Sequence, residues 1–274
     1  GEMIFQPLDK KRECKLFYYD GDLSEELPSN PTASWKYLDY LDGLKNVKYA
    51  NLFCQDKSLE EICPEHLKLA LEKTTNRLRA YMRAFSLAKI NMNDICFFDS
   101  VPEIFLLEYF DLKNQITRYV LENFEEPKNY DFLLELTKLT ETIRKNKLNI
   151  DVEGLNLGKY KTRQFIKKID KINHHIEYNI FGTKTGRLTT KPNSFPIMTL
   201  DKDHRSVLKP KNDVFVELDY NAAELRVFLG LLDIPQPKED IHAWIGKSVF
   251  KGGLSRDVVK KKVFAWLYNP HAKD

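Results

Sequence analysis

The sequence predicts an α+β fold, and three observations indicate this class. Residues 1–56 have the character of short strands and turns, as in the run 15–19 before the turn Asp20-Gly21-Asp22. Residues 58–171 repeat leucine and aromatic residues at helical spacing. Residues 214–219 alternate like a strand, and helical spacing returns after them.

Four helices are expected in the middle of the chain. Ser58 and Glu61 have the spacing of a capping box, and Pro64 suits the first turn of a helix that continues to Phe85. Ser100 gives a second start signal, and the segment 125–129 interrupts the helical spacing. The helices that follow Ser100 are expected at about residues 103–124, 130–145 and 159–171.

Two further helices are expected after the strand at 214–219. The first covers residues 222–232, and the proline-containing segment 233–237 ends it. The second begins with Ser255 as its cap and runs to Tyr268, where an Asn-Pro pair stops it.

The composition is that of a folded protein, with 42% hydrophobic and 30% charged residues. No apolar run approaches the roughly 20 residues that cross a bilayer, so no membrane association is expected. The cysteines lack the spacing of zinc ligands, and we expect reduced core thiols in an intracellular, cytoplasmic protein. They are Cys14, Cys54, Cys63 and Cys96.

Charge is distributed unevenly along the chain. Residues 138–274 contain 26 Lys and Arg against 16 Asp and Glu, a balance of +10, whereas residues 1–137 have a balance of 17 − 24 = −7. A basic half suits a polyanionic partner, because each cation placed on a phosphate releases a counterion. A solvated basic surface would give the same balance.

Two carboxylates flank the junction between the expected strand and the helix after it. Asp219 ends the strand, and Glu224 lies five residues further on, at the start of the helix. A strand-end aspartate beside free carbonyl groups suits Mg²⁺, which takes few protein oxygens and keeps water and phosphate as its other ligands. The same pair would equally serve as a helix N-cap and a first-turn partner of the helix dipole.

The last expected helix has four side chains spaced four residues apart. They are Arg256, Lys260, Phe264 and Tyr268, which fan along one side of the helix. The two cations can bind a triphosphate, and the two aromatic rings can stack on a base or a sugar. A solvated amphipathic helix would show the same spacing.

Two shorter segments also carry chemistry. Residues 183–190 place Gly186 and Arg187 among four threonines, a composition that can hold a nucleic-acid backbone and that also occurs in ordinary polar loops. Asp240-Ile241-His242 presents a single histidine, which is often a structural residue.

Together and in this order, the segments resemble the polymerase region of family A DNA polymerases, the DNA polymerase I type. Residues 185–190 match the signature T-G-R-L-S/T-S/T, and residues 219–226 match motif A, D-Y-S-Q-I-E-L-R. Residues 240–242 match D-I-H, and residues 256–268 match motif B, R-x-x-x-K-x-x-x-F-x-x-x-Y. The resemblance covers about residues 176–274.

The resemblance implies a role for each matching residue in template-directed DNA synthesis from dNTPs on a primer–template. Asp219 and the Tyr220 carbonyl would hold catalytic Mg²⁺, while Arg256 and Lys260 would be catalytic residues that contact the triphosphate together with His242. Phe264 would stack near the nucleotide, and Glu224 with Tyr268 would exclude the ribose 2′-hydroxyl. The residues implied in DNA binding are Arg187, Thr189, Asn193 and Arg205.

The chain also departs from the family pattern. Asn221 and Ala222 stand where the family usually has Ser-Gln, and no His-Asp-Glu motif C occurs. Two-metal phosphoryl transfer needs the carboxylates of both motifs. We therefore expect the N-terminal portion of a polymerase that acts with a second polypeptide or segment carrying motif C. The alternatives are a non-enzymatic nucleic-acid-binding module with this fold and a single-subunit RNA polymerase.

The resemblance further implies a division into four regions. Residues 1–110 would be a small α/β region at the position of the proofreading exonuclease, without catalytic carboxylates beyond the nearest candidate, Asp20-Gly21-Asp22. Residues 111–178 would be a helical thumb-like region, residues 179–232 part of the palm sheet, and residues 233–274 the start of a helical fingers domain. The general character resembles viral or phage members, which implies the host cytoplasm.

Overall fold

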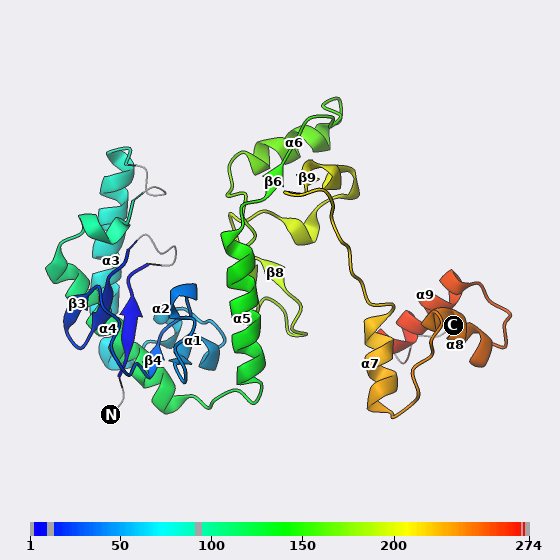
Figure 1. The fold of residues 1–274 in the computed structure, drawn as a ribbon, viewed down its shortest axis with the longest axis horizontal. Helices are drawn as coiled ribbons and strands as arrows, with labels where there is room; N and C mark the ends of the chain where they lie inside the picture. The colour runs from blue at the N-terminus through cyan, green and yellow to red at the C-terminus, as the bar shows by residue number, and fades with distance from the viewer. Residues whose placement is uncertain (1–2, 10–13, 91–94, 270, 272–274) are drawn as a thin grey trace. The chain divides into compact units, whose positions relative to one another are not determined.

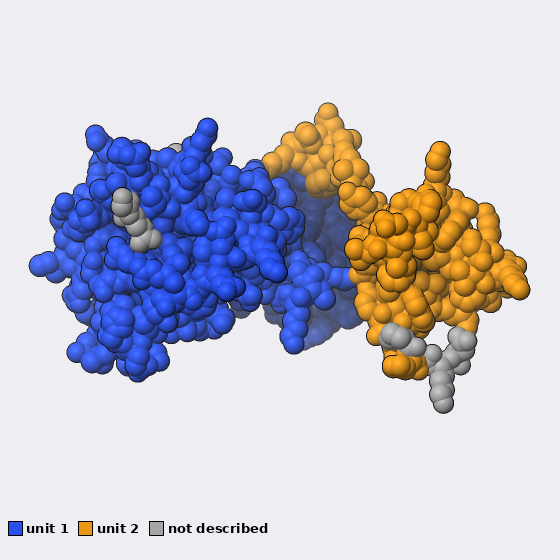
Figure 2. All heavy atoms as spheres, turned by 90° about the horizontal axis from the view of Figure 1, so that it is seen from below, with its two compact units in different colours: residues 1–209 blue, residues 210–274 orange. Residues whose placement is uncertain are grey.

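The structure is a computed structural model that describes residues 3–9, 14–90, 95–269 and 271. The chain forms two compact units, residues 1–209 and 210–274 (Figure 2). Both the helices and the small sheets agree with an α+β class (Figure 1). The four-region division stays a prediction, and the boundary between the two units falls inside the segment 179–232 that it assigns to the palm.

Short strands and turns occupy the first part of unit 1, as expected. Strands β1 (Phe5–Pro7), β2 (Phe17–Tyr19) and β3 (Asp22–Ser24) form an antiparallel sheet in the order β1-β2-β3. The turn between β2 and β3 uses Gly21 at a φ of 90°, a conformation that glycine adopts without steric cost. Strand β4 (Ala33–Ser34) pairs in parallel with β5 (Lys48–Tyr49).

The helices of unit 1 follow the expected pattern closely. The capping box is present, since the Ser58 hydroxyl accepts the Glu61 N–H at 3.2 Å and the Glu61 carboxylate accepts the Ser58 N–H at 2.7 Å. It opens the short helix α2 (Leu59–Ile62), and a separate long helix begins after Pro64. The remaining helices are α1 (Ala50–Phe53), α3 (Glu65–Leu87), α4 (Glu103–Asn123), α5 (Tyr130–Lys145) and α6 (Tyr160–Ile169).

Helix α4 crosses the interior of unit 1. Phe105, Phe110, Ile116 and Val120 recur at helical spacing and are fully buried. The N-terminal half of α4 packs on β2 and α3, and its C-terminal half packs on α1 and α5. The apolar positions of the amphipathic pattern at residues 103–124 are therefore the positions that the fold buries.

A smaller core lies toward the end of unit 1. Ile169, Phe195 and Val207 are its fully buried members. Two antiparallel pairs of short strands flank it. They are β6 (Asn149–Ile150) with β9 (Leu208–Lys209), and β7 (Tyr178–Asn179) with β8 (Thr189–Thr190).

In the described part of unit 2, three helices surround a core of their own. They are α7 (Ala223–Leu231), α8 (Ile241–Ser248) and α9 (Arg256–Tyr268), close to the two helices expected there and with one more between them. Leu225, Leu229, Ile241, Val259 and Val263 are buried between the three helices.

The strand expected at residues 214–219 is not formed. The segment is in no sheet, and its apolar side chains are exposed, from 64% for Val214 to 90% for Leu218. A strand is stabilised by hydrogen bonds to a neighbouring strand, and no such neighbour lies beside residues 214–219 in the described part of the chain. The alternating sequence therefore stands in an extended but unpaired segment.

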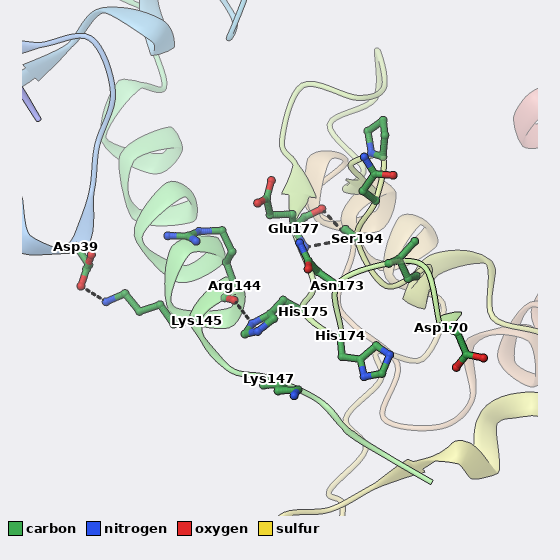
Figure 3. A pocket seen from close by; sticks show the side chains of 13 residues that line it. Asp39, Arg144, Lys145, Lys147, Asp170, Asn173, His174, His175, Glu177 and Ser194 are labelled. Carbon is green, nitrogen blue, oxygen red and sulfur yellow. Dashed lines mark hydrogen bonds and ion pairs between the residues drawn. The ribbon is translucent and has the colours of Figure 1, made fainter. Parts of the chain in front are cut away.

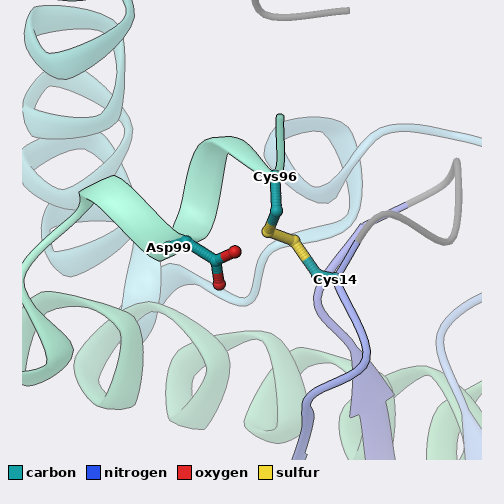
Figure 4. A group of neighbouring side chains, drawn as sticks. All are labelled: Cys14, Cys96 and Asp99. Atoms are coloured by element: carbon teal, nitrogen blue, oxygen red, sulfur yellow. A yellow bond between two sulfur atoms is a disulfide. The ribbon is translucent and has the colours of Figure 1, made fainter. Parts of the chain in front are cut away.

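The expectation of four reduced cysteines is wrong for two of them. Cys14 and Cys96 form a disulfide across 82 residues, and Asp99 lies beside it (Figure 4). The pairing was not visible in the sequence because distant segments meet only in the folded core. Cys54 and Cys63 are free and buried, and burial raises the pKa of the Cys54 thiol to about 11.

None of the helices among the described residues combines the length and the apolar character that a membrane-spanning helix needs.

The disulfide should contribute to the stability of the chain. Closing a loop of 82 residues restricts the unfolded state and is worth about 2–4 kcal/mol. We expect a reductant to lower the free energy of unfolding by this amount in denaturant titrations. The variant Cys54→Ala should respond to the reductant as the wild type does.

Thiol titration of the denatured, unreduced chain provides the direct count. It should find only Cys54 and Cys63 reactive, and all four cysteines after reduction. Four reactive thiols before reduction would show that Cys14 and Cys96 are not bonded.

Candidate nucleotide-binding site

Helix α9 brings the four side chains of the proposed motif B to one side of unit 2. Arg256 is the first residue of the helix and Tyr268 the last, with Lys260 and Phe264 between them. Ser255 occupies the N-cap position in an extended conformation, although its hydroxyl makes no capping hydrogen bond. Val259 and Val263, which adjoin these residues on the helix surface, anchor the helix in the core. Arg256, Lys260, Phe264 and Tyr268, here called the α9 strip, are therefore held in place by the packing of the helix that carries them.

The C-terminal end of α9 contacts the beginning of α7. The Tyr268 hydroxyl donates a hydrogen bond of 2.6 Å to Oε2 of Glu224, which lies in the first turn of α7. These residues are 44 positions apart, and only the fold brings them together. The juxtaposition that the resemblance implied for Glu224 and Tyr268 is therefore present.

An aromatic surface continues from Tyr268 along the helix. The rings of Phe264 and Tyr268 are stacked, with centroids 5.9 Å apart and an angle of 8° between their planes. The ring of His242, in α8, lies 5.9 Å from that of Phe264, at an angle of 45°. Phe264 is therefore in contact with two rings, one from its own helix and one from α8.

The N-terminal end of α9 is fixed by an ion pair. Nη2 of Arg256 donates to Oδ2 of Asp240 at 2.8 Å. Asp240 is the N-cap of α8, because its Oδ1 accepts the N–H of Ala243 at 3.0 Å. The Arg256 guanidinium and these further donors hold the pKa of the Asp240 carboxyl well below its usual range. Asp240 is therefore a permanent anion beside Arg256 at neutral pH.

His242 is buried under the cationic end of the strip. Its side chain is 2% exposed, and its Nδ1 has no hydrogen-bond partner. Burial lowers the pKa of His242, and the positive charges of Arg256 and Lys260 lower it further, against the opposing effect of Asp240. Nδ1 of His242 is enclosed by the protein, and a buried polar atom without a partner is uncommon in folded proteins.

The proposed metal ligands lie in the exposed segment before α7. Asp219 is exposed, and Tyr220 is 83% exposed. The N-cap position of α7 belongs to Ala222, at a φ of 49°, so the alternative role of Asp219 as the cap of that helix is wrong.

The donors present do not make a complete two-metal site. Among the described residues, the group with the spacing of metal ligands is Cys14, Cys96 and Asp99, in which the two sulfurs are bonded to each other. Asp219 and the Tyr220 carbonyl offer hard oxygen ligands of the type that Mg²⁺ prefers, and a second carboxylate would have to join them.

The four residues implied in DNA binding belong to unit 1. Thr189 is in β8, and Arg187 is exposed just before it, with its carbonyl accepting a hydrogen bond from Thr183 at 3.0 Å. Asn193 is in the turn after β8, at a φ of 63°, and Arg205 is exposed in the 3-10 helix Lys202–Val207. They therefore lie in a different unit from the residues of the α9 strip.

A pocket of about 1000 Å³ in unit 1 was not expected from the sequence (Figure 3). Arg144, Lys145, His174 and His175 line it together with acidic residues. Lys145 is paired with Asp39, Arg144 with Glu141, and each histidine contacts a backbone carbonyl. The sequence clue to this pocket was the pair of adjacent histidines that follows a basic helix end. Because these lining side chains already bond to other groups of the protein, they indicate no particular ligand.

Comparisons of the chain with protein-family models, with curated proteins and with solved structures gave no match. The function proposed below therefore depends on the motifs and on the geometry of unit 2.

The burial of His242 makes a prediction about pH. The pKa of His242 is lower in the folded protein than in the unfolded chain. The contribution of the buried, neutral imidazole to the free energy of unfolding is therefore complete above about pH 6.5, and it is lost as the pH falls toward the folded-state pKa. The variant His242→Gln lacks this titration. We expect the difference in unfolding midpoint between wild type and variant to narrow between about pH 7 and pH 5. Parallel pH profiles would show that His242 is not buried in its neutral form.

Proposed function

We propose that the chain supplies the incoming-nucleotide half of a template-directed DNA polymerase site. The observation that carries this proposal is the hydrogen bond between Tyr268 and Glu224. Both residues were selected from separate sequence motifs, and neither motif by itself predicts that the other lies nearby. The resemblance implies that these two residues together exclude the ribose 2′-hydroxyl, and their contact supports the proposal.

In this proposal, the α9 strip binds a dNTP along its length. Arg256 and Lys260 donate charge-assisted hydrogen bonds to the triphosphate, and His242 adds a third contact. The faces of Phe264 and Tyr268 pack on the base and sugar. Glu224, held by Tyr268, occupies the place where a 2′-hydroxyl would lie, so a ribonucleotide would collide with it.

The proposed catalytic function needs a partner segment. Asp219 and the Tyr220 carbonyl would contribute one part of an Mg²⁺ site, and a second polypeptide or segment with motif C would contribute the other carboxylate. The exposed, unpaired segment 214–219 favours such a partner, since its alternating apolar residues suit a strand in a larger palm sheet. The completed enzyme would transfer a deoxynucleotide to the 3′ end of a primer.

Unit 1 would bind the primer–template duplex in this proposal. Arg187, Thr189, Asn193 and Arg205 would contact its backbone, and the +10 balance of residues 138–274 would attract it. The Asp20-Gly21-Asp22 turn joins β2 to β3 as an ordinary hairpin turn, so we propose no proofreading role for it.

Binding of primer–template DNA to the 274-residue chain tests this proposal. We expect the affinity to fall by at least tenfold between about 50 and about 200 mM salt, because several phosphates are neutralised. Arg187→Ala and Arg205→Ala should each reduce the slope of log K against log salt by about one. Arg79→Ala, which removes an exposed arginine of α3, is the matched control and should leave the slope unchanged.

Two outcomes would contradict separate parts of this proposal. A flat salt response, or an equal effect of Arg79→Ala, would contradict a duplex-binding surface in this part of unit 1. The chain with Mg²⁺ and dNTPs should extend the primer negligibly. Efficient extension by the purified chain would overturn the requirement for a second segment.

A further inference from the structure

Asn221 connects the start of α7 with the start of α8. Its Nδ2 donates to Oδ2 of Asp240 at 2.8 Å, and its Oδ1 accepts the N–H of Ile241 at 3.1 Å. The same Oδ1 also accepts Nη2 of Arg226 at 3.1 Å. Both ends of this amide are therefore used, which fixes its orientation.

The carboxylate that Asn221 contacts is also the one that holds α9. Oδ2 of Asp240 accepts hydrogen bonds from Nδ2 of Asn221 and from Nη2 of Arg256, each at 2.8 Å. A continuous series of hydrogen bonds thus runs from Asn221 through Asp240 to Arg256. It connects the beginnings of all three helices of unit 2.

Arg226 stabilises the two segments that carry Asn221 and Asp240. Its guanidinium donates to the carbonyl of Asn221 at 2.8 Å, to that of Pro237 at 2.9 Å and to that of Glu239 at 3.1 Å. These bonds hold the loop before α8 against the start of α7. Asn221 and Asp240 are therefore kept at a fixed separation.

We propose that Asn221 is a positioning residue, which orients the Asp240 carboxylate and through it the Arg256 guanidinium for the triphosphate. The proposal rests on the function proposed above, in which Arg256 binds that group. Asn221 stands where the family that the chain resembles usually has serine. A serine hydroxyl donates and accepts through a single oxygen, whereas the amide here donates through Nδ2 to Asp240 and accepts through Oδ1 from Ile241 and Arg226.

Asn221 would help the triphosphate bind because ordering an exposed arginine side chain costs conformational entropy. Arg256 is half exposed, and an isolated exposed ion pair contributes little because its side chains move and water screens their charges. A second donor that fixes the carboxylate reduces this freedom before the ligand arrives. Asn221 is neutral, so its removal changes the order of Arg256 without changing the charge of the site.

The test compares Asn221→Ala with Gln236→Ala. Gln236 donates a hydrogen bond to the Arg226 carbonyl at 2.9 Å, so it supports the same helix without contact to Asp240 or Arg256. Affinities for inorganic tripolyphosphate and for dATP are measured by calorimetry on the 274-residue chain. We expect Asn221→Ala to raise both Kd values by about three- to tenfold, as expected for loss of order at a charged hydrogen bond. Gln236→Ala should leave both values unchanged.

A second readout requires no nucleotide. The Nε–H signal of Arg256 in NMR spectra, assigned by its loss in Arg256→Lys, should be sharp in the wild type and in Gln236→Ala. It should be broadened in Asn221→Ala, and in Asn221→Ser, which replaces the alanine variant if that one does not fold.

The two readouts separate the positioning role from the proposed function. Unchanged Arg256 signals in the Asn221 variants would overturn the positioning role, and so would unchanged Kd values. If the wild type binds neither tripolyphosphate nor dATP, the nucleotide-binding function is wrong, while the NMR comparison still decides whether Asn221 orients Arg256.

Discussion

The attachment of α9 at both of its ends is the constraint on which the candidate site depends. Tyr268 binds Glu224 at the start of α7, and Arg256 binds Asp240 at the start of α8. Between these points, Val259 and Val263 are buried in the core, Lys260 is exposed, and Phe264 is partly buried against His242. The proposed binding surface requires this attachment, because spacing of four residues along a helix does not by itself fix the helix in place.

The exposed segment before α7 has the opposite character. Residues 214–219 have the sequence of a strand, yet they are unpaired, and the apolar side chains of the segment contact solvent. Asp219 consequently lies on a segment that pairs with no strand in the described part of the chain, whereas Glu224 and the α9 residues lie on packed helices. In the proposed function, selection of the nucleotide would therefore depend on unit 2 alone, whereas the Mg²⁺ site would need a further carboxylate.

The sequence predicted the elements better than it predicted their contacts. The capping box at Ser58, the bounds of the helix 130–145 and the end of α9 at Tyr268 follow from local spacing, which local physics fixes. The prediction of a strand at 214–219 was wrong because a strand forms only beside a neighbouring strand, which the periodicity of the sequence does not reveal. The bond between Cys14 and Cys96 was missed for a related reason, since each cysteine lies far from the other in the chain. The role of Asn221 was visible only as a departure from a motif.

The central claim, that Glu224 and Tyr268 close the sugar side of a nucleotide site, is tested most directly by comparing dATP and ATP binding to the 274-residue chain. The wild type should bind dATP at least about tenfold more tightly, a difference of about 1.4 kcal/mol. Glu224→Ala should bring the ratio close to one. Glu239→Ala, which removes a carboxylate paired with Lys247 at 2.7 Å in the same unit, is the control and should preserve it. An unchanged ratio in Glu224→Ala, or an equal loss in Glu239→Ala, would contradict the account.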